Sequence, residues 1–250
     1  MCPEKSPLVR QTEKYVKYAM SHNDSTLMIA HDFKHVDRVR KWALTIAAGE
    51  GYPHLEMLEV TALLHDIGLG QVSGNKDIRD RAALQPHGPI GSEIAARFLK
   101  ENSSLSVEEI HLVADAVKHH SDSPKAMSEY LNTLGEKGKL AAILTDADML
   151  DALGAVGVMR AFTSKYFLPE YDPADIKGIA WGLADKECLE KFGAHPGRAL
   201  APVNTIVDQI NQQIRYYSGL HTGTANRLAT PLVQFMKDFV LQLEHEIMSN

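Results

Sequence analysis

The chain has 250 residues, of which 44% are hydrophobic and 23% charged, and its formal net charge is −6. That length suits one large domain or two small ones, and a mildly acidic chain is poorly suited to wrapping nucleic acid. The two cysteines, Cys2 and Cys188, are too few for a disulfide framework, which predicts a reducing, cytoplasmic location.

Membrane association is not expected either. The first residues, MCPEKSPLVRQTEKYVK, contain no long apolar run of the kind that a secretory signal has. No apolar run in the chain approaches the roughly 18 residues needed to span a bilayer.

The apolar pattern is helical along almost the whole chain. Helices are predicted, in chain order, over residues 8–20, 32–48, 54–67, 87–101, 106–120, 124–135, 138–167, 201–219 and 222–248. Thr222 or Thr224 is expected to cap the last of them. Between these helices, residues 71–86 read as a polar surface loop, and residues 168–200, rich in proline and glycine, as an irregular segment that serves as a lid or an insertion. Because no alternation of period two extends beyond four residues, the expected fold class is all-α.

Histidines and aspartates occur in short motifs along these helices. The side chains that can bind a metal are His31, Asp32, His35, His65, Asp66, His87, His119, His120, Asp146, Asp148 and Asp151. Imidazole and carboxylate together suit divalent Mn, Fe, Ni, Co or Zn. No cysteine joins them, which argues against a structural zinc site.

The pair His65–Asp66, in TALLHDIGLG, falls where a predicted helix ends. Adjacent residues on a helix differ by about 100° in direction, so both cannot face one ion from the middle of a helix. At a helix end two neighbours can straddle an ion, and the partial negative charge of a helix C-terminus favours a cation. The alternative is that the pair is only a solvated helix end.

The order of these motifs resembles that of the HD-domain superfamily of metal-dependent phosphohydrolases. The matching stretches are AHDFKHVDRVRKWA, ALLHDIG and TDADMLDALGAVGVMRAF, with a looser match over residues 205–240. Together they are similar to small bacterial HD hydrolases of unknown or nucleotide pyrophosphohydrolase activity. The resemblance implies a single HD domain over residues 1–250, with a metal-binding core at about 20–165, the irregular segment 168–200 and additional C-terminal helices over 201–250.

Carried over residue by residue, the resemblance implies that His35, His65, Asp66 and Asp148 bind the metal. The family's last aspartate stands in an Ala-Asp-x-Leu context, which here is Ala147-Asp148-Met149-Leu150. Asp146, two residues away on a helix, points to the opposite side, so both cannot face one ion. Asp151 or Asp146 is left as a supporting or helix-end group. Asp66 and Asp148 are the expected catalytic residues, with Asp66 also able to accept a proton. Asp32 can orient the His35 ring, and His31 can support the site or face the substrate.

Some members of the superfamily bind two metals, and their additional histidines correspond here to His87, His119 and His120. The expected cofactor is therefore one or two divalent ions per chain, with Mn, Fe, Ni, Co, Mg and Zn not distinguished. In the alternative interpretation, His87 only begins a helix, and the other two only end one.

The expected function is hydrolysis of a small phosphorylated molecule, with a nucleotide as the first candidate, by metal-activated water. Residues that can meet the phosphates are Arg38, Lys118, Lys76, Arg79 and Arg97. Two other functions stay open: an HD-type di-iron oxygenase, which needs both metal sites, and a non-catalytic ligand-binding domain, for which no expected ligand residue has been lost.

Overall fold

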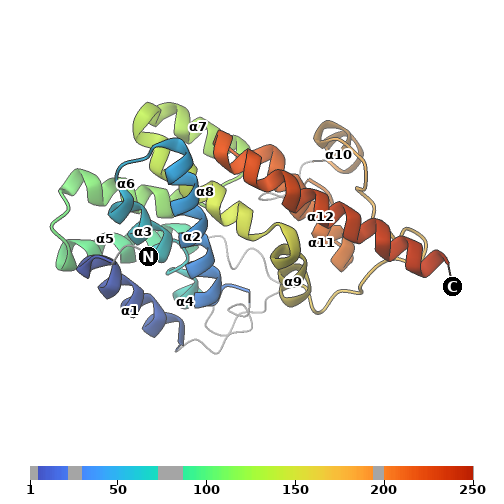
Figure 1. Ribbon diagram of the computed structural model, residues 1–250, viewed down its shortest axis with the longest axis horizontal. Coiled ribbons are helices and arrows are strands. Elements are labelled where there is room, and N and C mark those ends of the chain that lie inside the picture. Colours follow the sequence, from blue (N-terminus) through green and yellow to red (C-terminus); the bar gives the residue numbers. More distant parts are fainter. Residues whose placement is uncertain (1–4, 22–29, 73–86, 194–199, 250) are drawn as a thin grey trace. The chain divides into compact units, whose positions relative to one another are not determined.

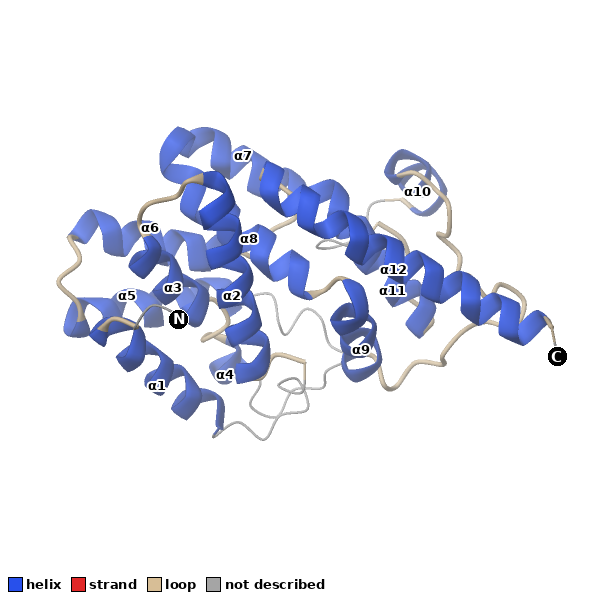
Figure 2. Ribbon diagram, in the orientation of Figure 1, coloured by secondary structure: helices blue, strands red, loops and turns tan. Residues whose placement is uncertain are grey.

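The computed structural model describes residues 5–21, 30–72, 87–193 and 200–249. Within these ranges the chain is built of helices and contains no strand (Figure 2). This confirms the all-α fold class. The chain divides into two compact units, Met1–Asp148 and Met149–Asn250.

The first unit is a cluster of helices around α3 (Figure 1). Its elements are α1 (Pro7–Ser21), α2 (Phe33–Glu50), α3 (Leu55–Leu64), α4 (Leu69–Val72), α5 (His87–Asn102), α6 (Val107–His119), α7 (Pro124–Leu134), the short 3₁₀ helix η3 (Gly135–Gly138) and α8 (Lys139–Asp151), which runs on into the second unit. Helix α3 packs against α1, α2 and α6, and α5 packs against α6.

Helix α3 is apolar on nearly every side, as expected of a helix at the centre of a unit. Its buried residues are Met57, Leu58, Val60, Thr61, Ala62, Leu63 and Leu64. The helix ends at Leu64, so His65 and Asp66 follow directly from the core and are themselves buried.

An ion-pair network joins α2 to α3. The Arg40 guanidinium lies 2.8 Å from Asp37 Oδ1 on its own helix and 2.6 Å from Glu59 Oε1 on α3. Because Arg40 is 7% exposed, these pairs are largely shielded from solvent. The network therefore fixes the relative position of the two helices whose ends carry His35 and His65.

The second unit contains α9 (Gly154–Ser164), α10 (Asp185–Phe192), α11 (Ile206–Ile214), the 3₁₀ helix η4 (Arg215–Gly219) and α12 (Gly223–Met248). Helices α11 and α12 both pack against α9. Of the two threonines considered as caps, Thr222 is the N-cap of α12, and its side chain accepts a hydrogen bond from the Ala225 backbone N–H.

The single helix predicted over residues 138–167 is wrong, because the chain forms two helices there. Leu153 is extended, with φ −109° and ψ 167°, and Gly154 has φ +66°, a left-handed conformation that favours glycine. A Cβ at Gly154 would also lie 2.9 Å from Leu232 Cδ2. The apolar pattern continues across this break, so periodicity alone cannot detect it.

The segment expected to be irregular, 168–200, includes the short helix α10 and is held by polar side chains from α11 and η4. Arg215 donates to the carbonyls of Ala180 and Leu183, each at 2.8 Å. Asp208 accepts a hydrogen bond of 3.0 Å from the Ile179 backbone N–H. Of the predicted loop 71–86, residues 73–86 lie outside the described residues.

Candidate metal centre

Two helix ends in the first unit present a histidine to the same place. His65 follows the last residue of α3, and His120 follows the last residue of α6. Each histidine donates through Nδ1 to the backbone carbonyl three residues before it: His65 to Ala62 at 2.8 Å and His120 to Val117 at 2.7 Å. Both helices also point the partial negative charge of a C-terminus at this region, which favours a cation.

The Asp66 carboxylate lies between two groups of imidazoles. Its Oδ2 accepts a 2.8 Å hydrogen bond from His31 Nδ1 and lies 3.3 Å from both His35 Nε2 and His65 Nε2. Its Oδ1 lies 3.4 Å from His120 Nε2 and 3.8 Å from His87 Nε2. One carboxylate thus faces three histidines with one oxygen and two with the other.

Asp148 completes the arrangement from α8. Its Oδ1 lies 3.5 Å from His35 Nε2. Ligand atoms lie within 4.8 Å of one another in each of three sets: His31, His35 and Asp66; His35, His65 and Asp148; and His65, Asp66 and His120. We call these residues together with His87 the Asp66 cluster.

The positions of the protons on the histidine rings indicate whether the Asp66 cluster can hold a cation. Since Nδ1 of His65 and of His120 donates to a carbonyl, Nε2 of each neutral ring is a bare acceptor. Yet His65 Nε2 lies 3.2 Å from His35 Nε2, and His120 Nε2 lies 3.3 Å from His87 Nε2. Each pair therefore holds either a proton between its two nitrogens or a cation beside them, and a divalent metal fits the residues present.

The same close contacts shift the pKa values of His65 and Asp66. Burial alone would lower the pKa of His65, but the Asp66 and Asp148 carboxylates and the Ala62 carbonyl raise it to about 9. Burial would raise the pKa of Asp66, but the charges of His65 and His31 and hydrogen bonds from His120 and His31 hold it well below its usual range. The cluster thus gathers positive charge around a buried carboxylate, and a metal ion can take the place of these protons.

Close backbone contacts bring α5, and with it His87, to the cluster. A Cβ at Gly68 would lie 2.0 Å from the His87 carbonyl oxygen, and one at Gly88 would lie 2.4 Å from the Lys118 carbonyl oxygen. Only glycine permits these approaches. The residue pattern alone does not predict this role, although the glycines of ALLHDIG and PHGPIG stand near the histidines concerned.

The structure separates some of the residues considered as ligands from the Asp66 cluster. His119 donates to Asp122 at 2.6 Å and stacks on Tyr130 with 4.2 Å between ring centroids, so of the His119–His120 pair only His120 faces Asp66. Asp151 pairs with Arg160 at 2.7 Å within the second unit. Asp146 is fully buried on α8 but belongs to none of the three ligand sets.

The role expected for Asp32 differs from the one observed. Its carboxylate caps α2 by accepting from the backbone N–H groups of Lys34 and His35, at 3.0 and 3.2 Å. It therefore fixes the helix end on which His35 stands, rather than the His35 ring. Asp32 can cap in this way because an N-cap carboxylate reaches the N–H groups two and three residues further on.

Of the five residues expected to contact phosphates, the structure describes Arg38, Lys118 and Arg97. Arg38 is half-buried one turn after His35, and Lys118 is exposed near the end of α6. Lys76 and Arg79 lie outside the described residues. Arg97 lies on α5 and lines a groove against α1.

Comparison with known proteins agrees with this architecture. Residues 32–153 match the family model described as HD domain. This stretch of the chain is therefore similar to an HD domain, and every member of the Asp66 cluster except His31 lies within the matched range. No protein of curated function matches the chain in sequence.

Several solved structures share the fold over nearly the whole chain. An HD-superfamily hydrolase from Bacillus thuringiensis aligns with a TM-score of 0.64 and 20% identity, covering 99% of this chain and 100% of its own. A protein described as a predicted HD superfamily hydrolase, from an uncultured Thermotogales bacterium, aligns with 0.57 and 22%, covering 96% and 93%. Bacillus subtilis YpgQ in complex with ADP aligns with 0.55 and 22%, covering 96% and 94%.

One further observation concerns membranes. Among the helices of the described residues, none combines the length and the apolar content that crossing a bilayer requires.

Proposed function

We propose that this chain is a metal-dependent phosphohydrolase that acts on a small phosphorylated molecule. The observation that supports the proposal most is the buried Asp66 carboxylate, which is 2% exposed and has imidazoles against both of its oxygens. We propose His35, His65, Asp66 and Asp148 as the residues that hold the metal. When bound, a divalent ion lowers the pKa of water toward about 7 and offsets the negative charge of a phosphoryl group.

The protein's own residues have distinct tasks in this proposal. The carbonyls of Ala62 and Val117 keep the Nδ1 protons of His65 and His120 in place, so that each Nε2 faces the site as an acceptor. Asp66 stays ionised because the neighbouring imidazoles hold its pKa well below its usual range, and we propose it as the carboxylate that binds the metal at the centre of the cluster. His31, whose side chain is 38% exposed, donates to Asp66 from the solvent side, where a substrate would arrive.

We propose a nucleotide as the first substrate class to test. Two findings support it: the resemblance of the sequence to small HD hydrolases, and the fold shared with YpgQ, which was solved with ADP. We expect a small-molecule substrate, and we propose no role for a membrane or for nucleic acid.

The test is a screen for released phosphate and pyrophosphate from nucleoside di- and triphosphates with Mn²⁺, Ni²⁺, Co²⁺, Mg²⁺ and Zn²⁺ in turn. Activity should require the metal and should be abolished in Asp66→Asn and in His65→Ala while the helical circular dichroism is retained. His111→Ala, an exposed histidine on the same helix as Val117, is the matched control. Full activity of Asp66→Asn, or metal binding without hydrolysis of any phosphate ester or anhydride, would contradict the proposal and favour a ligand-binding domain.

A second candidate function is supported by the contacts of the other carboxylate oxygen of Asp66, Oδ1. Oδ1, His87 and His120 form a second group of ligand atoms within 3.8 Å of one another. Two ions sharing Asp66 would fit the di-iron oxygenase alternative as well as a two-metal hydrolase. Elemental analysis of His120→Ala separates one ion from two, since its metal content should fall by one ion per chain only if this second group binds. A requirement for iron and oxygen would then identify the oxygenase.

A further inference from the structure

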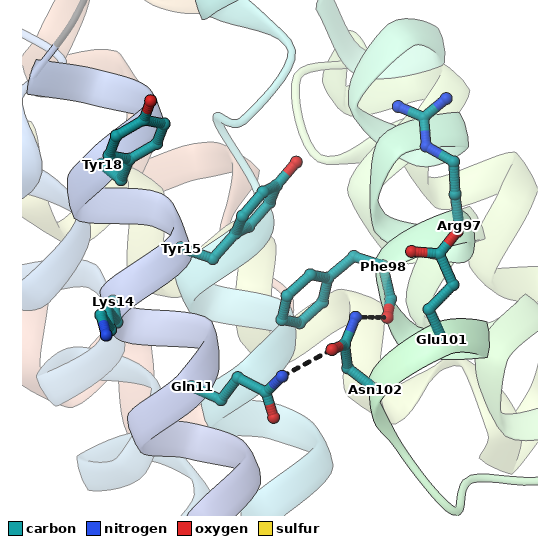
Figure 3. Close-up of a pocket in the computed structure, with 8 residues that line it drawn as sticks. All are labelled: Gln11, Lys14, Tyr15, Tyr18, Arg97, Phe98, Glu101 and Asn102. Atoms are coloured by element: carbon teal, nitrogen blue, oxygen red, sulfur yellow. Dashed lines mark hydrogen bonds between the residues drawn. The ribbon is translucent and has the colours of Figure 1, made fainter.

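A groove on the first unit lies between α1 and α5 (Figure 3). None of its lining residues belongs to the Asp66 cluster. Its volume is about 490 Å³, within the range of small-molecule sites. Its lining residues are Gln11, Lys14, Tyr15, Tyr18, Arg97, Phe98, Glu101 and Asn102. Phe98 follows His87 by 11 residues on α5, which corresponds to about 16 Å along the helix.

Aromatic rings form the floor of this groove. Tyr15 on α1 stacks against Phe98 on α5, with 4.6 Å between centroids and an interplanar angle of 18°. Tyr18, one turn further along α1, is 66% exposed. One end is closed by Gln11, which donates to Asn102 Oδ1 at 2.5 Å, while Asn102 donates to the Phe98 carbonyl at 2.8 Å.

Positive charge and hydrogen-bond donors surround the rings. Among the described residues Lys14 and Arg97 have no ion-pair partner, and Glu101 is the single carboxylate among the lining residues. Figure 3 shows the hydroxyls of Tyr15 and Tyr18 pointing to the same side as the Arg97 guanidinium. The Tyr15 phenol and the Arg97 guanidinium are donors for an anionic group.

We propose that this groove is a binding site for a small planar aromatic anion. The ring of the ligand packs against the Tyr18 side chain, which is 66% exposed, and its anionic group accepts hydrogen bonds from Arg97 and the Tyr15 hydroxyl, with Lys14 adding positive charge. Because α5 also supplies His87, such a ligand would contact the helix that contributes to the Asp66 cluster without entering the cluster.

The test uses 1-anilinonaphthalene-8-sulfonate, a fluorescent planar aromatic anion, titrated into the whole chain with EDTA present. We expect saturable binding at one site per chain, weakened about fivefold or more in Arg97→Gln and in Tyr18→Ala. The matched controls are Lys100→Gln, an exposed cation on the same helix that does not line the groove, and Tyr166→Ala, an exposed tyrosine of the second unit. Both should bind as the unchanged chain does.

Two further variants keep the test decisive. Glu101→Gln removes the groove's carboxylate and should lower the dissociation constant of the single saturable site, with the helical circular dichroism and Tm unchanged, whereas partial unfolding would add many dye sites per chain. Asp66→Asn should bind the dye normally, whether or not the proposed hydrolase activity exists. No saturable binding, an effect of Arg97→Gln no larger than that of Lys100→Gln, or loss of binding in Asp66→Asn would each overturn the proposal.

Discussion

Substituting Gly68 by alanine should disrupt the packing that brings α5 to the Asp66 cluster. The new Cβ would lie 2.0 Å from the His87 carbonyl oxygen and 2.6 Å from the Gly91 nitrogen. Both are backbone atoms, so relief requires the first turn of α5 to move by at least about 1 Å in a close-packed interior. Overpacking of this kind costs about 3 kcal/mol, which in a chain of this size lowers Tm by about 6–12 °C.

The assay is thermal unfolding followed by circular dichroism, together with metal content per chain. Gly51→Ala is the control, because Gly51 has a left-handed conformation, φ +64°, but no atom within 4 Å of its Cβ position. It should cost only the about 1–2 kcal/mol of a left-handed alanine. His87→Ala removes the side chain without overpacking, and so separates loss of a ligand from loss of packing. A Gly68→Ala variant as stable as the unchanged chain would refute the close approach of α5 to this turn.

Three other outcomes are expected. Arg40→Met should destabilise the fold by about 3 kcal/mol in urea unfolding, because it leaves Glu59, whose side chain is only 15% exposed, without its cation. The double variant with Glu59→Leu should recover much of that loss, and no recovery would mean that the network does not join α2 to α3. Burial raises the pKa of Tyr52 to about 12, so the stability that this tyrosine contributes is fully present below pH 10 and is lost as the pH rises toward 12. Ultraviolet titration of Tyr52→Phe should show one late-ionising tyrosine fewer than the unchanged chain. An unchanged titration would contradict the assignment. A divalent metal at 100 times its Kd should stabilise the chain by about 2.7 kcal/mol, and Asp66→Asn should show no such shift in Tm.

Most helices could be predicted from the sequence because their apolar residues recur with helical spacing. Observed bounds such as Phe33–Glu50 and His87–Asn102 differ from the expected ranges by only one or two residues. The break at Gly154 could not be predicted, since the stretch on both sides is apolar and a left-handed glycine gives no periodic signal. Tertiary contacts, here with Leu232, decide the conformation at that point.

The candidate site was predictable in its residue types but not in its geometry. The sequence can place the ligands on separate helices; helical direction indicates that Asp146 and Asp148 cannot both face one ion, and the choice of Asp148 came from the family resemblance. It could not say which of His119 and His120 faces Asp66, because adjacent residues point in different directions and the rotation of α6 depends on its packing. Nor could it show that one carboxylate lies between two groups of histidines, since that depends on contacts between α3, α5 and α6.

The hydrogen bonds from His65 and His120 to the carbonyls of their own helices have an evolutionary consequence. In many proteins an imidazole is oriented by a neighbouring aspartate or glutamate, which a single codon change can remove. Here the acceptors are the main-chain carbonyl oxygens of Ala62 and Val117. Every amino acid has such an oxygen. The orientation of these two rings is therefore robust to substitution at the residues that supply it, and mutations are expected to damage it only by changing where the helices end.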